Sequence, residues 1–211
     1  MPLEVIAHRG LWSSKYPKNS TSALFSALDG GFGVETDVRD LNGRLVISHD
    51  MPTSGCIDLA KFLSYYHANN FDSMLALNIK SDGLCNEVLK HVQNFNLKNY
   101  FVFDMSIPDT FSYYNMNIQA YIRESEFENY PLLLNQSSGI WLDQMIENAY
   151  DQGWLNEKIN LGNNLCFVSP ELHKRDHLSF WNTLRLANIN NTQNKLMICT
   201  DYPEQARNFF K

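Results

Sequence analysis

Histidine and charged side chains follow two short apolar segments near the beginning of the sequence. His8 and Arg9 come directly after the apolar run that starts at Leu3, and His49 with Asp50 closes another apolar run. Imidazole gains and loses a proton near neutral pH, and arginine is a common partner of anionic groups. Side chains of these types, placed where apolar segments end, are suited to proton transfer and to binding of a charged ligand.

Two further pairs of polar side chains are spaced two residues apart within apolar segments. Glu35 and Asp37 form one pair, and Asn78 and Lys80 form the other. Because side chains alternate between the faces of a strand, the members of each pair share a face. A lone histidine at a strand end is more often structural, and a Glu-x-Asp pair is more often an exposed face. The occurrence of all these features at matching strand ends favours one shared site.

The elements that must hold these side chains are short strands that alternate with helices. Short apolar runs bounded by turn residues predict eight strands, at residues 4–8, 33–39, 73–80, 100–105, 118–123, 139–143, 165–169 and 196–200. Helical patterns are predicted at residues 20–28, 59–69, 83–94 and 176–188, with shorter helices near 108–114, 124–134 and 145–153. Residues 44–48 are predicted to form a hairpin with the second strand, and 188–194 a polar loop.

Eight strands that alternate with helices are typical of an α/β protein with a (β/α)8 TIM barrel. A chain of 211 residues, 44% of them hydrophobic, can bury the core of one such barrel. We therefore expect a single compact domain over residues 1–211. The active sites of such barrels lie at the carboxyl ends of the strands, where the polar pairs fall.

Composition and charge exclude several classes of protein. The formal net charge is −6 and the pI is about 5.5, whereas nucleic-acid binding needs a surplus of Lys and Arg. No long apolar leader or membrane-length apolar run is found, so we expect neither a signal peptide nor a transmembrane segment, and a cytoplasmic location. Widely spaced cysteines are expected to be reduced thiols, at Cys56, Cys85, Cys166 and Cys199. Histidines without partners at catalytic spacing are expected to face solvent, at His67, His91, His173 and His177.

Several motifs agree in order and spacing with those of one known family. They read IAHRG at 6–10, Pro17-Lys18-Asn19-Ser20 followed by Ala23 and Ala27, GVETDVR at 33–39, ISHD at 47–50 and ICTDYP at 198–203. In these motifs the sequence resembles the glycerophosphodiester phosphodiesterases, which belong to the superfamily of phospholipase C-like phosphodiesterase TIM barrels. These are (β/α)8-barrel enzymes that hydrolyse phosphodiesters with a divalent metal and two histidines. Residues from about 105 to 195 match the family only as a barrel pattern.

The resemblance implies a role for each motif residue. His8 and His49 would be the general acid and base, one for the nucleophile and one for the departing alcohol. Glu35 and Asp37 would hold Mg²⁺ or Ca²⁺ through hard oxygen ligands. The resemblance also implies that a phosphate group is bound by two cations, Arg9 and Lys80. The substrate would be a small phosphodiester, cleaved to an alcohol and a phosphomonoester such as glycerol 3-phosphate.

The sequence departs from the family pattern in two places. The family's third strand usually reads Glu-x-Lys, and its Glu is a metal ligand, whereas this chain has Asn78 before Lys80. The third ligand is therefore either the weaker amide oxygen of Asn78 or another carboxylate, for which Asp104 is the candidate. Only residues 51–58 separate the ISHD motif from the next predicted helix. The family's insertion at this place is then short or absent, and we expect an open pocket.

Two alternatives to this hydrolysis stay open. One is a phospholipase D-like relative of the sphingomyelinase D kind, in which a substrate hydroxyl attacks and a cyclic phosphate forms. Such relatives are typically secreted and disulfide-bonded, and the sequence indicates neither. The other is a non-catalytic phosphate-binding barrel, which Asn78 makes conceivable but which has no need of both His8 and His49. The sequence predicts neither the head group of the substrate nor the oligomeric state.

Overall fold

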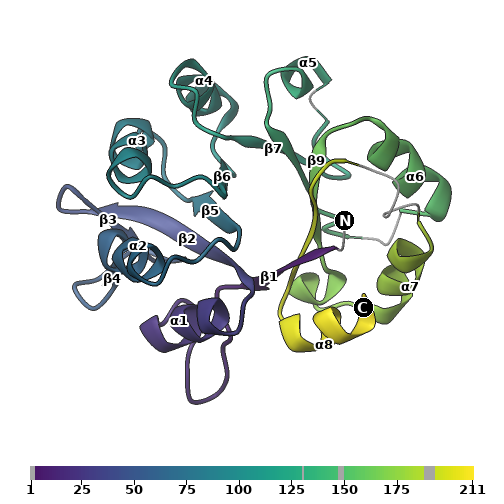
Figure 1. The fold of residues 1–211 in the computed structure, drawn as a ribbon. Helices are drawn as coiled ribbons and strands as arrows, with labels where there is room; N and C mark the ends of the chain where they lie inside the picture. The colour runs from purple at the N-terminus through teal and green to yellow at the C-terminus, as the bar shows by residue number, and fades with distance from the viewer. Residues whose placement is uncertain (1–2, 130, 147–149, 188–192) are drawn as a thin grey trace. The chain divides into compact units, whose positions relative to one another are not determined.

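The computed structural model describes residues 3–129, 131–146, 150–187 and 193–211. The chain divides into two compact units. The first unit is Ala7–Ala120, and the second unit combines Met1–Ile6 with Tyr121–Lys211. Each unit is an α/β structure in which strands and helices alternate along the chain (Figure 1). A single domain over residues 1–211 stays a prediction.

The first unit contains parallel strands with one hairpin at the side. Its parallel strands are β2 (Gly33–Leu41), β5 (Leu75–Ile79) and β6 (Tyr100–Phe103), and β1 (Glu4–His8) is the other neighbour of β2. The predicted hairpin is present, because β3 (Arg44–Ile47) runs antiparallel to β2, and it also pairs with the two-residue strand β4 (Ile57–Asp58). A parallel bridge between Val102 and Ala120 continues the pairing beyond β6.

Helices of the first unit begin where the sequence provides caps. They are α1 (Thr21–Asp29), α2 (Leu59–Ala68), α3 (Cys85–Asn94) and α4 (Ile107–Asn115). The Ser20 hydroxyl accepts a hydrogen bond from Ala23 N at 3.2 Å, and the Asp58 carboxylate accepts one from Ala60 N at 2.8 Å. Side-chain acceptors of this kind satisfy backbone N–H groups that have no partner within the helix. Helix α1 packs against α2, and α3 packs against α4.

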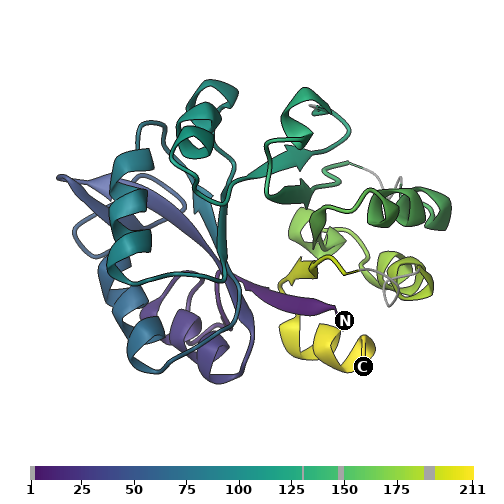
Figure 2. The same cartoon turned by 45° about the horizontal axis from the view of Figure 1, so that its top comes forward.

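The second unit contains four strands that pair in parallel. Its strands are β7 (Tyr121–Glu124), β8 (Gly139–Leu142), β9 (Asn164–Val168) and β10 (Leu196–Thr200), paired in this order. Its helices are α5 (Pro131–Leu134), α6 (Gln152–Asn160), the 3₁₀ turn η1 (Pro170–His173), α7 (Leu178–Leu186) and α8 (Pro203–Phe209). Figure 2 shows α6 and α7 side by side, and they contact each other.

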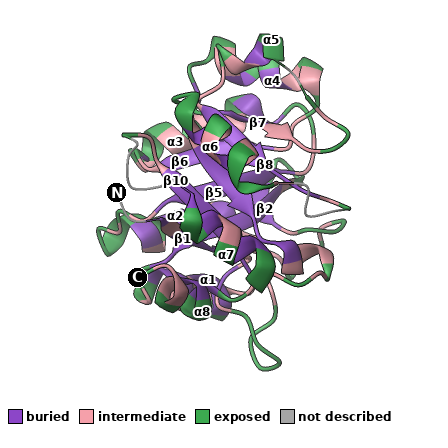
Figure 3. Cartoon of the chain, turned by 90° about the vertical axis from the view of Figure 1, so that its right-hand side faces the viewer, coloured by how far each residue is buried: buried purple, intermediate pink, exposed green. Residues whose placement is uncertain are grey.

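The strands form the buried centre of each unit. All residues of β5, β8 and β10 are buried, which is typical of parallel strands covered on both faces. Figure 3 shows this contrast, with buried strands and with exposed residues on the outward sides of the helices. Polar residues that are buried in such strands therefore stand out, and Glu35, Asp37 and Asn78 are among them.

Each of the eight predicted strands has a counterpart, with ends that shift by up to three residues. Two predicted helices differ from the structure. The helix predicted near 145–153 begins only at Gln152, because Asp151 caps it by accepting a bond from Trp154 N at 2.8 Å. In place of the helix predicted at 124–134, only Pro131–Leu134 is helical among the described residues. Residues 147–149 and most of the predicted 188–194 loop lie outside the described residues.

The structure also tests two smaller expectations. The four cysteines are free, and Cys85, Cys166 and Cys199 are buried. Among the described residues, none of the helices combines the length and the hydropathy that crossing a membrane requires.

Candidate active site

The strand register brings two carboxylates and an amide together in the first unit. Asp37 on β2 lies opposite Asn78 on β5, and Glu35 lies two residues before Asp37 on the same face. Glu35 is 1% exposed, Asp37 is 0% exposed and Asn78 is 8% exposed. Glu35 and Asp37, for which the resemblance implied a role as metal ligands, therefore share one buried face of the sheet with Asn78, one of the two candidates for the third ligand.

A tight turn after β1 places His8 and Arg9 beside this face. Arg9 and Gly10 have φ angles of 58° and 88°, so the chain reverses sharply at the strand end. A Cβ atom on Gly10 would lie 2.5 Å from the backbone of Ala23, which explains the glycine at this position. The backbone N–H of Arg9 donates to the Glu35 carbonyl at 3.0 Å and lies 3.2 Å from the Glu35 carboxylate. His8 Nε2 lies 3.9 Å from Glu35 Oε2, so the turn brings the imidazole to the buried carboxylate.

Two cations meet at Asp37. Arg9 Nε lies 2.9 Å from Asp37 Oδ2, and Lys80 Nζ lies 3.5 Å from Asp37 Oδ1. Lys80 Nζ also donates to Asp104 Oδ2 at 3.2 Å. The side chains of Arg9 and Lys80 keep 20% and 18% of their surface exposed, whereas Asp37 is fully buried. A ligand that approaches the site from solvent therefore reaches the two cations before it reaches the carboxylate.

Asn19 holds the Asp37 carboxylate from the other side. Its Nδ2 donates to Asp37 Oδ2 at 2.8 Å, and its Oδ1 accepts from the Thr36 hydroxyl at 2.9 Å. Its backbone N–H donates to the Arg9 carbonyl at 3.0 Å. Asn19 was not among the predicted site residues. Its φ of 61° belongs to the left-handed region, in which asparagine is enriched, and the motif around Asn19 was the available signal.

Burial changes the protonation of Glu35. The pKa of this carboxyl is raised from 4.5 to about 8, chiefly because burial disfavours the charged form and also because Asp37 is close. Arg9 and Lys80 act in the opposite direction but do not cancel this effect. Glu35 is therefore mainly protonated at neutral pH, and a cation bound at its oxygens must replace the proton.

Two buried side-chain oxygen atoms of the site accept no hydrogen bond from the described residues. Asp37 Oδ1 and Asn78 Oδ1 are buried, and neither accepts a hydrogen bond from the part of the chain that the structure describes. Hard oxygen atoms of this kind, with the Glu35 carboxylate, fit Mg²⁺ or Ca²⁺. Within the described ranges, no three His, Cys, Asp or Glu side chains form a metal-binding cluster. Asn78 supplies the third oxygen-bearing side chain on this face, and the Asp104 carboxylate accepts from Lys80 Nζ.

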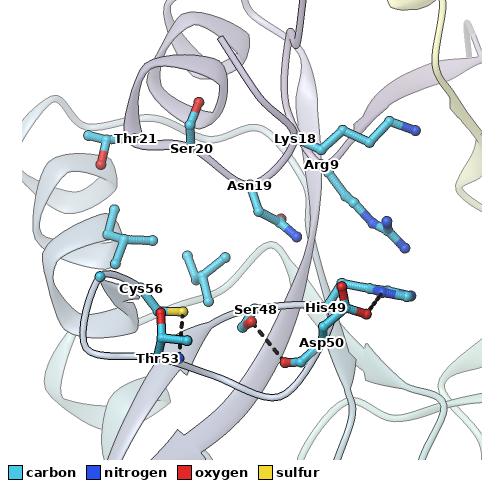
Figure 4. Close-up of a pocket in the computed structure, with 13 residues that line it drawn as sticks. Arg9, Lys18, Asn19, Ser20, Thr21, Ser48, His49, Asp50, Thr53 and Cys56 are labelled. Atoms are coloured by element: carbon cyan, nitrogen blue, oxygen red, sulfur yellow. Dashed lines mark hydrogen bonds and ion pairs between the residues drawn. The ribbon is translucent and has the colours of Figure 1, made fainter.

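His49 lines a pocket in the same unit. Its Nδ1 lies 2.9 Å from Asp50 Oδ1, its side chain is 46% exposed, and its carbonyl accepts from Arg39 Nε at 3.1 Å. The pocket has a volume of about 650 Å³, and both Arg9 and His49 line it (Figure 4). Helix α2 begins at Leu59 as predicted, so only a short segment forms the wall that follows His49.

The expectation for the remaining histidines was wrong in part. His67 is exposed, but His173 Nε2 lies 2.6 Å from Asp143 Oδ1 in the second unit. His91 Nδ1 is 2.8 Å from the Glu87 carbonyl oxygen, and the His177 ring packs against Trp181 at 4.4 Å. These partners come from helix geometry or from distant segments, which spacing in the sequence does not show.

No protein-family model matches the chain, and no curated protein matches it. Comparison with solved structures gives a different result, because several match over nearly the whole chain.

Three of these solved structures carry the same description. A glycerophosphodiester phosphodiesterase from Parabacteroides distasonis ATCC 8503 is 18% identical with a TM-score of 0.74, over 99% of this chain and 97% of that chain. A candidate glycerophosphodiester phosphodiesterase from Galdieria sulphuraria is 13% identical with a TM-score of 0.78, over 99% and 97%. A glycerophosphodiester phosphodiesterase from Agrobacterium tumefaciens str. C58 is 15% identical with a TM-score of 0.66, over 96% and 97%. The chain therefore has the TIM-barrel fold of these glycerophosphodiester phosphodiesterases, as its sequence predicted.

Proposed function

We propose that the protein is a phosphoric diester hydrolase that cleaves a small, glycerophosphodiester-like substrate to an alcohol and a phosphomonoester. One observation carries the proposal: His8, Arg9 and Lys80 converge on the buried carboxylates of Glu35 and Asp37. The descriptions of the three structural neighbours support the same reaction.

In the proposed reaction, Arg9 and Lys80 bind the phosphodiester. A phosphodiester carries a negative charge that repels a nucleophile, so catalysis needs cations on its oxygen atoms. The guanidinium of Arg9 offers a planar set of donors, and the ammonium of Lys80 offers a compact charge. Both are partly exposed beside buried Asp37, which holds them in place by ion pairs. This local pair of cations allows an anion to bind in a chain whose net charge is −6.

Glu35, Asp37 and Asn78 are proposed to hold Mg²⁺ or Ca²⁺. Asp37 and Asn78 lie opposite each other in the strand register, and neither Asp37 Oδ1 nor Asn78 Oδ1 accepts a hydrogen bond from the described residues. Asp37 Oδ1 has an ion-pair contact with Lys80 Nζ at 3.5 Å, and both oxygen atoms support this assignment. A divalent ion supplies further positive charge for the phosphoryl oxygen atoms when it is bound. Because Asn78 is neutral, we propose weak binding, and we assign Asp104 to the support of Lys80.

In the proposed reaction, His8 and His49 transfer the protons. Hydrolysis forms a bond between a water oxygen and phosphorus, and it breaks the bond between phosphorus and the alcohol oxygen. One imidazole takes the proton from the water, and the other gives a proton to the departing alcohol. Both side chains are accessible, with 12% of His8 and 46% of His49 exposed. We propose a small-molecule substrate and not a nucleic acid, and a cytoplasmic location stays a prediction.

The experiment is a steady-state assay on a panel of glycerophosphodiesters with identification of both products. His8→Ala and His49→Ala should each lower turnover by about 10²- to 10⁴-fold, as expected for loss of general acid–base catalysis. His67→Ala is the matched control, because His67 is an exposed histidine on α2. Unchanged turnover in either site variant, or an equal loss in the control, would contradict the assignment.

A further inference from the structure

The pocket beside Arg9 and His49 lies next to the proposed machinery, yet most of its lining residues take no part in it. Its volume of about 650 Å³ is in the range of small-molecule sites. We propose that this pocket receives the departing alcohol of the diester, and that it selects a polyol over an alcohol with a quaternary ammonium group. The proposal rests on the proposed phosphodiester hydrolysis and names the head group.

The position of the two histidines indicates which arm of the diester enters the pocket. His49 lines the pocket, whereas His8 is not among its lining residues and lies 3.9 Å from the Glu35 carboxylate. With Nδ1 of His49 on Asp50, Nε2 is the nitrogen that can give a proton to an alcohol in the pocket. His8, beside the buried carboxylate, then takes the proton from the attacking water. In this arrangement the bond breaks between phosphorus and the oxygen of the alcohol that occupies the pocket. This alcohol takes the proton from His49 and leaves as the product without a phosphate group.

Hydroxyl groups on facing walls suit an alcohol that carries several hydroxyls. Ser20 and Thr21 lie at the start of α1, and Ser48 and Thr53 lie on the opposite segment (Figure 4). The Ser20 hydroxyl caps α1 by accepting from Ala23 N and is directed toward that helix, so Thr21 is the hydroxyl residue that this wall offers (Figure 4). The Ser48 hydroxyl donates to the Asp50 carbonyl, so it still has lone pairs to accept a hydrogen bond. Hydroxyls both donate and accept, and they match the same property of a polyol.

The charges of the lining oppose a cationic head group. Arg9 and Lys18 line the pocket, and Asp50 is its only carboxylate among the described residues. The Asp50 side chain is 92% exposed and is turned to His49, so it does not provide a buried counter-ion. No Phe, Tyr or Trp side chain is among the described residues that line the pocket, and the nearby Trp12 ring faces Lys18 Nζ at 4.5 Å. Quaternary ammonium groups are usually held by aromatic cages, which this pocket lacks in its described lining.

The test compares three diesters that share the glycerol 3-phosphate arm and differ in the other alcohol. These are glycerophosphoinositol, glycerophosphoethanol and glycerophosphocholine. We expect kcat/KM to fall in this order, by about tenfold at each step, because lost hydrogen bonds and an unpaired cation each cost this much. Equal kcat/KM for all three, or a preference for glycerophosphocholine, overturns the inference and leaves the proposed hydrolysis standing.

Two variants connect the preference to the pocket. Lys18→Glu should reduce the discrimination against glycerophosphocholine by about tenfold, and Lys15→Glu is the control, because Lys15 has the same charge in the same loop but does not line the pocket. Thr53→Val should raise KM for glycerophosphoinositol by about fivefold and leave glycerophosphoethanol unchanged. If Lys15→Glu alters the preference as much as Lys18→Glu, the pocket does not set it.

Binding without turnover separates this inference from the proposed function. Ligand-observed NMR with the wild-type protein and a chelator should detect myo-inositol but not choline, and Thr53→Val should weaken the inositol signal. Detection of inositol without hydrolysis of any diester would contradict the function and support the pocket. Hydrolysis without inositol binding, or with equal binding of choline, would overturn the pocket assignment alone.

Discussion

Replacement of Glu35 by Gln should remove a pH dependence from the stability of the fold. Burial and the nearby Asp37 raise the pKa of Glu35 from 4.5 to about 8, so the folded protein keeps a proton that the unfolded chain releases. The contribution of the protonated Glu35 to the free energy of unfolding is fully present below pH 4.5. It falls as the pH rises and is lost above about pH 8. Each pH unit between these limits costs about 1.4 kcal/mol, and the whole interval costs about 5 kcal/mol. Gln is neutral at every pH and should abolish this slope.

Urea unfolding in the presence of a chelator measures the effect. The free energy of unfolding of the wild type should fall between about pH 5 and about pH 8 more steeply than that of Glu35→Gln. Glu157→Gln is the matched control, because Glu157 is an exposed glutamate on α6, and it should keep the wild-type slope. Equal slopes of the free energy of unfolding against pH in the wild type and in Glu35→Gln would refute the argument that Glu35 is buried in its protonated form.

Three further predictions concern the cation site. Because Glu35 is mainly protonated at neutral pH, binding of Mg²⁺ or Ca²⁺ should release about one proton at about pH 7, and the affinity should rise as the pH rises to about 8. Calorimetry in two buffers with different ionisation enthalpies measures the number of protons released. Metal binding without proton release would contradict the prediction. Asn19→Gly keeps the left-handed backbone but removes the donor to Asp37, so metal affinity should fall by about tenfold, and an unchanged affinity would show that Asn19 does not position the carboxylate. Asn78→Glu should tighten metal binding, whereas Asp104→Ala should not weaken it; loss of binding in Asp104→Ala alone would make Asp104 the third ligand.

Side-chain alternation within strands was enough to predict which side chains share one face of the candidate site. Glu35 and Asp37 are two residues apart on β2, and Asn78 and Lys80 have the same spacing at the end of β5. Since neighbouring parallel strands place their carboxyl ends together, the shared face followed from the strand predictions alone. The eight strands were identifiable because each is a short apolar run between turn residues.

The contacts that hold this face in place could not be predicted from spacing. Asn19 reaches Asp37 across 18 residues, and Arg39 reaches the His49 carbonyl across 10 residues, so both contacts depend on how loops fold back on strands. The raised pKa of Glu35 depends on complete burial, which the sequence does not specify. Helix α6 was misplaced because the capping Asp151 lies inside the segment predicted to be helical.

The most direct test of the central claim is phosphorus NMR of a glycerophosphodiester incubated with the protein. Formation of glycerol 3-phosphate should stop when a chelator is added and return when Mg²⁺ or Ca²⁺ is restored. Accumulation of a cyclic phosphate would show a different reaction, with a substrate hydroxyl as the nucleophile. Absence of any phosphomonoester at high protein concentration, or a rate that the chelator does not change, would contradict metal-dependent hydrolysis at this site.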